Sequence, residues 1–130
     1  MLLVKTKIAP SQIHGIGLFA DQFIAEGAIT WKMMPPFDLK VSQKDLLKLS
    51  DPAKEIFFMY SYYSLYSKKY VLCFDNDRFI NHSDDPNIVE GEVLVGGEEA
   101  VSVAGRDIFP GEEMTCDYRL FDIGHHKNGW

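Results

Sequence analysis

Proline and glycine cut this chain into short segments, and this division limits the folds that it can adopt. Two runs with the character of a strand end at Pro10 and at Pro35-Pro36, where the missing N–H groups prevent further ladder hydrogen bonds. Gly96-Gly97 separates two later runs in the manner of a hairpin. The expected strands are residues 2–8, 28–34, 70–74, 88–95 and 99–104. Short strands without regular βαβ alternation predict a β-rich α+β fold rather than a doubly wound nucleotide-binding fold.

The middle of the chain is predicted to contain one or two helices. Ser42 followed by Asp45 resembles a capping box, and Asp51-Pro52 supplies a capping carboxylate followed by a proline suited to a first helical turn. The aromatic stretch "IFFMYSYYSLY" at 56–66 fits a helix and a strand equally well, because both bury apolar side chains.

Composition indicates one intracellular domain. The chain has 130 residues, 46% hydrophobic and 25% charged, which is enough for one core. No apolar run approaches the roughly 20 residues of a membrane span, and the N-terminus lacks the pattern of a secretory signal. Two cysteines, Cys73 and Cys116, are too few for a disulfide framework. A net charge of −6 disfavours nucleic acid and suits a basic protein partner, although an acidic surface also simply aids solubility.

Two polar motifs are candidates for ligand binding. "HGIGLF" brings Gly15 and Gly17 close together, which suits either a plain turn or a loop whose backbone approaches a ligand. It lacks the third glycine of a dinucleotide fingerprint and the lysine of a P-loop. Within "RFINHSDDPN", Asn81 and His82 offer donors and acceptors that could read a purine edge. The other reading of this motif is a polar turn closed by Asp85-Pro86-Asn87.

Other chemistry has weaker support in the residues. No Ser-His-Asp, Cys-His or paired-carboxylate arrangement stands out for hydrolysis. Taken alone, Cys116 reads as an inert buried thiol and Tyr118 as a packing residue of a strand. The spacing of the remaining metal-ligand candidates fits neither an EF-hand nor a zinc motif. These candidates are Asp75, Asp77, His82, Asp84 and Asp85.

Three motifs taken together carry a resemblance to a known family. "GIGLFA", "RFINHSDDPN" and "GEEMTCDY" follow one another in an order and spacing that resembles the SET domain of protein-lysine methyltransferases. The resemblance covers residues 5–118, with 35–70 as the variable insert, so that residues 1–130 form a single SET domain. It implies small sheets, one or two helices in the insert, and a knot-like crossing near the C-terminus. In that crossing, Phe79 and Ile80 are expected to anchor the chain in the core.

The resemblance also implies S-adenosylmethionine as cofactor. Asn81 and His82 match residues that hold its adenine, largely through backbone groups, and Arg78 is expected near the same pocket. The main chain at the early glycine motif is expected to contact the methionine end of the cofactor. The residues concerned are Gly15, Ile16 and Gly17.

The implied reaction is attack of a lysine ε-amine on the sulfonium methyl group. The amine must be neutral, and at pH 7 its deprotonation costs about 4.6 kcal/mol in water. An apolar channel beside the sulfonium cation lowers that cost. Tyr118 matches the catalytic tyrosine of the family, and Tyr60 or Tyr62 is expected to line the channel.

The sequence departs from the family at two places, one that affects how many methyl groups are transferred and one that affects how the active site is covered. Cys116 stands where many relatives carry Phe or Tyr, which widens the channel and leaves the number of transferred methyl groups open. Many relatives close the site with a cysteine-rich zinc segment, whereas residues 119–130 contain no cysteine, so no metal is expected. Either Phe121 and Trp130 form an aromatic lid, or a second subunit of a homodimer completes the cleft.

The sequence therefore favours a methyltransferase acting on a lysine of a basic protein, for which a histone or histone-like tail is one candidate. Such an enzyme is expected in the cytoplasm, or in the nucleus of a eukaryote. One alternative is a catalytically weak SET module that works as a cofactor-binding or protein-interaction adaptor, which Cys116 and the short C-terminal tail would suit. A third is an acidic interaction domain without a small-molecule ligand.

Overall fold

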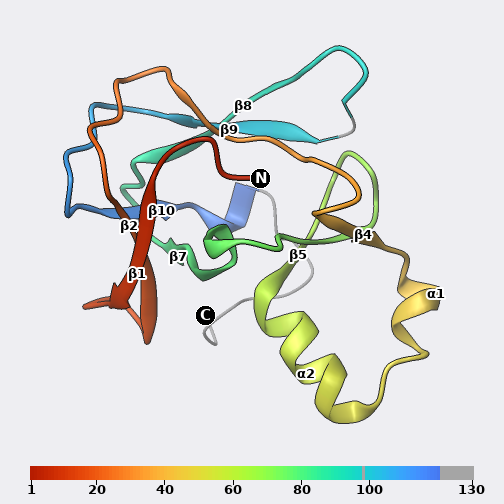
Figure 1. Cartoon of the computed structure of the whole chain (residues 1–130). Coiled ribbons are helices and arrows are strands. Elements are labelled where there is room, and N and C mark those ends of the chain that lie inside the picture. Colours follow the sequence, from red (N-terminus) through yellow and green to blue (C-terminus); the bar gives the residue numbers. More distant parts are fainter. Residues whose placement is uncertain (98, 121–130) are drawn as a thin grey trace.

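The computed structural model of the chain describes residues 1–97 and 99–120. Within them, ten short strands form three small sheets, with two helices at one edge of the molecule (Figure 1). This confirms the β-rich α+β fold. The sheets have the strand orders β1-β2-β10-β7, β3-β9-β8 and β4-β6-β5.

The four-stranded sheet joins the beginning, middle and end of the chain. Its strands are β1 (Thr6–Pro10), β2 (Ile16–Ala20), β7 (Asn81–His82) and β10 (Glu113–Cys116). β10 is antiparallel to β2 and parallel to β7, with Thr115 opposite Asn81 and Cys116 opposite His82. We call this parallel pair the β7–β10 crossing. It places the three motifs of the sequence beside one another, as the resemblance predicted.

The first strand differs from its sequence prediction. Leu2 forms an isolated bridge with Trp31, and β1 begins only at Thr6, so residues 2–8 serve two separate pairings. The strand continues to Pro10, which lies opposite Ile16. Proline is tolerated there because β1 is the outer strand of its sheet.

The second sheet contains the hairpin predicted around Gly96-Gly97. Gly96 has a φ of +77°, the left-handed conformation that such a turn needs. The register of the hairpin shifts between Glu90 and Val93. The strands are β3 (Ile29–Trp31), β8 (Ile88–Val93) and β9 (Ala100–Ala104).

The insert contains both helices and the third sheet. The Ser42 hydroxyl accepts a hydrogen bond from the Asp45 N–H, as a capping box predicts. In the second helix the cap is Ser50 rather than Asp51, because Asp51 already begins the helix. The ambiguous aromatic stretch forms the end of that helix and then a strand. The elements are β4 (Leu39–Val41), α1 (Gln43–Leu46), α2 (Asp51–Tyr60), β5 (Ser61–Tyr63) and β6 (Tyr70–Leu72).

Two 3-10 helices, η1 (Asn76–Phe79) and η2 (Tyr118–Leu120), flank the β7–β10 crossing. Ile80, which follows η1, packs against the main core cluster, the group of buried residues that includes Leu18 and Met114. Phe79 lies outside that cluster and packs edge-on against Tyr60, with ring centroids 5.5 Å apart. Only Ile80 therefore anchors this segment in the main core, whereas Phe79 fixes it to α2.

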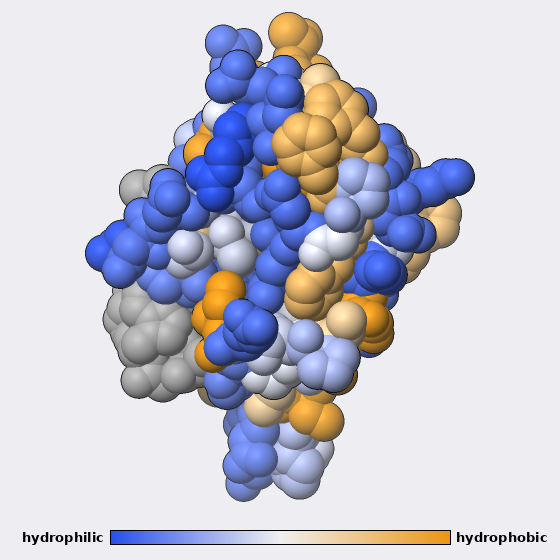
Figure 2. Space-filling model, turned by 90° about the vertical axis from the view of Figure 1, so that its left-hand side faces the viewer, coloured by the Kyte–Doolittle hydropathy of each residue, from blue (hydrophilic) through white to orange (hydrophobic). Residues whose placement is uncertain are grey.

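Core packing places residues 114–118 against the centre of the described part of the molecule. Leu18, Met114, Cys116 and Tyr118 belong to one buried cluster, and each is at most 3% exposed. Figure 2 shows that, on the side facing left in Figure 1, apolar residues lie in separate groups among hydrophilic ones. Among the described residues, no helix is long and apolar enough to cross a membrane.

Candidate active site

Asn81 connects the β7–β10 crossing to the glycine motif. Its side chain is buried, and the amide nitrogen lies 3.0 Å from the His14 carbonyl oxygen, 3.3 Å from the Ile16 carbonyl oxygen and 3.1 Å from Glu113 Oε2. All three are acceptors, so Asn81 acts as a donor that fixes the loop around Gly15. The side chain is thus used to fix the conformation of the loop.

The glycines of the loop have different roles. Gly15 has a φ of +46°, and a Cβ added there would meet no atom within 4 Å. Gly17 is buried, and a Cβ there would lie 2.5 Å from Glu113 Oε2 and 3.0 Å from the Ser11 Cβ. Gly17 is therefore required by the protein's own packing, whereas Gly15 and Ile16 are exposed.

His82 links the crossing to Tyr118. Its Nδ1 atom accepts the backbone N–H of Tyr118 at 3.2 Å, and the two rings have centroids 5.5 Å apart. The Nε2 atom lies 3.0 Å from Asp84 Oδ1. These partners assign the tautomer of the neutral ring, with the proton on Nε2 and donated to Asp84.

Asp117 lies on the same side of His82, with Oδ1 3.7 Å from Nδ1. Hydrogen bonds from Arg119 lower the pKa of Asp117. The carboxylate is therefore an anchor for the start of η2 rather than a proton donor.

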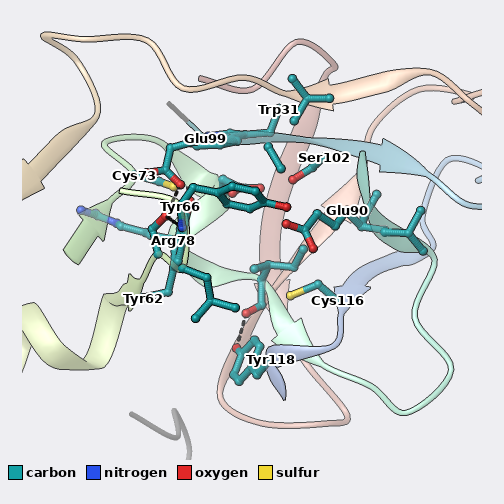
Figure 3. Close-up of a pocket in the computed structure, with 18 of the residues that line it drawn as sticks. Trp31, Tyr62, Tyr66, Cys73, Arg78, Glu90, Glu99, Ser102, Cys116 and Tyr118 are labelled. Atoms are coloured by element: carbon teal, nitrogen blue, oxygen red, sulfur yellow. Dashed lines mark hydrogen bonds between the residues drawn. The ribbon is translucent and has the colours of Figure 1, made fainter. Parts of the chain in front are cut away.

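One cavity, of about 110 Å³, is lined by all three residues expected in the substrate channel (Figure 3). Tyr60, Tyr62 and Cys116 line it, together with Tyr118. Its wall also includes residues that sequence reasoning missed, which are Trp31, Tyr66, Glu90, Glu99 and Ser102.

Tyr118 lies at the end of the cavity nearest the crossing. Its hydroxyl donates a hydrogen bond to the Ile80 carbonyl oxygen, and its ring is 3% exposed. Because the phenol proton is committed to Ile80, the oxygen can act toward an entering amine only as an acceptor. Cys116 and Ile88 line the same cavity and supply an apolar surface.

Tyr60, Tyr62 and Arg78 line the wall contributed by the insert and by η1. The Arg78 guanidinium lies 5.7 Å from the centroid of the Tyr60 ring and 5.0 Å from that of Phe79. The exposed Arg78 therefore packs over the rings that join η1 to α2. Desolvation raises the pKa of the Tyr62 phenol, so Tyr62 is a neutral wall residue at physiological pH.

The missed residues left little trace in the sequence. Glu99 is a buried carboxylate, and its Oε2 accepts a hydrogen bond from the Ser64 hydroxyl at 2.5 Å. It stands in an acidic stretch that resembles a solvated turn. The sequence predicts that Asn87 closes a turn, yet its side chain binds two backbone groups of β10. Both roles depend on partners far away in the sequence.

The metal-ligand candidates are used within the protein. Asp75 accepts the Leu2 N–H at 2.8 Å, and Asp77 lies 3.6 Å from the Cys73 thiol. Within residues 1–97 and 99–120, no group of three His, Cys, Asp or Glu side chains is placed to hold a metal ion. Phe121 and Trp130, the proposed aromatic lid, lie outside the described residues.

Comparison with known proteins agrees with this geometry. The SET domain family matches residues 15–119. ASHH4 of Arabidopsis thaliana is 27% identical over 128 residues, covering 92% of this chain and 35% of its own length. The histone-lysine N-methyltransferase ASHR3 of the same plant is 48% identical over 48 residues, covering 36% of this chain and 10% of its own length. This chain thus spans only a minor part of these relatives.

Solved structures show the same fold. The Plasmodium falciparum protein PFL0690c has a TM-score of 0.61 at 18% identity, covering 90% of this chain and 95% of its own. A Polycomb complex structure, ctPRC2 in an autoinhibited conformation bound to S-adenosylmethionine, has a TM-score of 0.65 at 20% identity, covering 93% of this chain and 16% of its own. The family match covers most of the chain, and the strands agree with it in arrangement. The chain belongs to the SET domain family.

Proposed function

We propose that this SET domain transfers a methyl group from S-adenosylmethionine to the ε-amine of a lysine in a basic protein. The observation that carries the proposal is the position of Tyr118. Its ring lines the cavity, and its backbone N–H binds His82, whose neighbour Asn81 fixes the glycine loop. A donor held at the loop and an amine entering the cavity would therefore meet at Tyr118.

The glycine loop fits a cofactor held by backbone groups. Gly15 and Ile16 are exposed, and among the described residues no atom lies within 4 Å of a Cβ placed at Gly15. We assign cofactor binding to the loop, to the backbone of the crossing, and to Arg78, which precedes the crossing in η1. When bound, S-adenosylmethionine supplies an electrophilic methyl group on a sulfonium. The residues assigned are Gly15, Ile16, Gly17, Arg78, Asn81 and His82.

The cavity suits a neutral amine. Ile80, Ile88 and Cys116 provide an apolar surface next to Tyr118, and such a surface lowers the pKa of an amine by desolvation. The Tyr118 oxygen would accept one N–H of the amine and so orient its lone pair. Tyr60 and Tyr62 would confine the aliphatic part of the lysine.

Cys116 is proposed to set how many methyl groups fit. The side chain is 2% exposed and lines the cavity, so a larger residue there would fill space beside Tyr118. A thiol also offers a much weaker hydrogen bond than a phenol. We therefore expect products beyond monomethyl-lysine.

The substrate class is inferred from charge and from the relatives. The chain carries a net charge of −6, and ASHR3 is named a histone-lysine N-methyltransferase. A histone tail is the first substrate to test. The intracellular location and the homodimer expected from the sequence stay predictions.

Mass spectrometry of a histone and basic-protein mixture, incubated with the protein and S-adenosylmethionine, tests the proposal. A mass gain of one or more methyl groups on lysine is the expected result, and it should form far more slowly with Tyr118→Phe. Cofactor binding in calorimetry without transfer to any protein would instead identify an adaptor. If millimolar S-adenosylmethionine fails to raise the melting temperature, the methyltransferase and the cofactor-binding adaptor are both excluded. The acidic interaction domain without a small-molecule ligand then remains.

A further inference from the structure

The cavity is acidic at the end away from Tyr118. Glu90 on β8 and Glu99 next to β9 both line it, and in Figure 3 they lie around the Tyr66 side chain, apart from Tyr118. Asp77 and Arg78, also in the wall, balance each other formally. Lys40 forms an ion pair with Glu99 at 3.8 Å and offsets one of the two glutamates. The exposed Glu90 therefore leaves this end with a net negative charge.

Glu99 provides a sign of ligand binding that is independent of charge counting. Its side chain is 2% exposed, yet Oε1 has no hydrogen-bond partner among the described residues. The ammonium group of Lys40 is 3.8 Å from Oε1, beyond hydrogen-bond distance. A buried carboxylate oxygen without a hydrogen bond is costly, so a cationic donor that approached it would gain more than at the surface.

Tyr66 and Glu90 form the outer part of this end. Tyr66 is 54% exposed, and a hydrogen bond to Glu90 raises the pKa of its phenol. Ser64 holds the turn that carries Tyr66. The Ser64 hydroxyl oxygen accepts the Tyr66 N–H at 3.1 Å, and the same hydroxyl donates to Glu99. An aromatic ring with a carboxylate on each side is suited to hold a guanidinium or ammonium group.

We propose that Glu90 and Glu99, with the ring of Tyr66, form a subsite for a second cationic side chain of the substrate, close to the target lysine. The inference rests on the proposed function, because the target lysine is placed at Tyr118. It narrows the substrate class from a basic protein to a lysine with a neighbouring arginine or lysine. The subsite lies at the end of the cavity away from Tyr118. This separation matters because a carboxylate beside the target amine would raise the pKa of the amine and oppose its deprotonation.

Charge reversal on β8 tests the subsite. Glu90→Lys changes the rim of the cavity, whereas Glu92→Lys makes the same change in net charge on the same strand at a residue outside the cavity. The probes are short single-lysine peptides with Arg, Gln or Glu at each neighbouring position in turn. Methyl transfer is measured by mass spectrometry. Binding is measured separately by fluorescence anisotropy, on peptides with norleucine in place of the target lysine.

The wild type is expected to favour an Arg neighbour over Gln by at least about tenfold in both measurements. Glu90→Lys should abolish or invert this preference, and Glu92→Lys should keep it. If Glu90→Lys leaves the preference intact, or Glu92→Lys removes it equally, the subsite is refuted even though methylation continues. Binding that depends on Glu90 without any methylation would support the subsite and overturn the methyltransferase. If neither a Glu90-dependent preference nor any methyl transfer is observed, both the subsite and the methyltransferase function are refuted.

Discussion

Two asparagines of the "RFINHSDDPN" motif hold the site together without touching the cavity. Asn81 donates to two carbonyl oxygens of the glycine loop. Asn87 donates to the Glu113 carbonyl oxygen and accepts the Thr115 N–H, both at 2.9 Å, and so takes the place of a strand residue beside β10. A primary amide is suited to both tasks because it carries a donor and an acceptor.

Removing the Asn87 amide should destabilise the whole protein. Asn87 is 3% exposed, so Asn87→Ala leaves two buried backbone groups of β10 without partners, at a cost of about 2–4 kcal/mol. Urea unfolding followed by circular dichroism measures the loss, and Asn76→Ala in η1 is the control outside the crossing. A midpoint equal to that of the control would show that Asn87 does not hold β10.

Removing the Tyr118 hydroxyl should separate catalysis from stability. Tyr118→Phe loses one hydrogen bond to Ile80, worth about 1 kcal/mol of stability, but it also loses the acceptor that would orient the amine. We expect the single-turnover methyl-transfer rate to fall by about 10²-fold, with peptide affinity nearly unchanged. Full activity with saturating peptide would exclude this role for the hydroxyl.

Residue roles were predictable from the sequence only where a family motif names them. The motif "GEEMTCDY" pointed to Tyr118 and Cys116, whereas the insert offered either Tyr60 or Tyr62 without a motif to choose between them. All four residues line one cavity. Glu99 could not be found in this way, because its burial depends on Ser64 and Lys40 from the insert. The roles assigned to the cavity and loop residues stay predictions until activity is measured.

Among the elements, the glycine loop and β10 are packed too closely for any side chain at residue 17. Gly17→Ala is expected to destabilise the protein by about 1–3 kcal/mol, because the new methyl group would overlap the Glu113 carboxylate. Glu113→Ala should relieve this overlap, so the double variant should lose clearly less than the sum of the single changes. Thermal unfolding of the four proteins measures the coupling, and strictly additive effects would contradict it.

Local signals predicted some elements and missed others for physical reasons. The hairpin at Gly96 and the Ser42 cap were predictable because turn and cap chemistry are contained in a few adjacent residues. β7 has only two residues and pairs with a strand more than thirty positions away, so no periodicity reveals it. Its position was expected solely from the resemblance of three ordered motifs.

For the molecule as a whole, the buried wall of the cavity makes stability fall at high pH. Desolvation raises the folded-state pKa of Tyr62 above the unfolded value of about 10. Its contribution is therefore complete below pH 10 and is lost as the pH rises further, at up to about 1.4 kcal/mol per pH unit. Tyr62→Phe should flatten the dependence of unfolding free energy on pH above 10, measured by urea titration. Wild type and variant compared at pH 8 provide the control, and equal slopes above pH 10 would refute the assignment.

The place of β10 inside its sheet has a consequence for biosynthesis. β10 lies between β2 and β7, so one edge of the β1–β2 pair and the whole of β7 have no partner in this sheet until β10 emerges from the ribosome. Nascent chains that lack residues 113–118 therefore expose the edges of β2 and β7 together with unburied core side chains. Such intermediates are prone to aggregation, because unpaired strand edges and exposed apolar side chains associate readily.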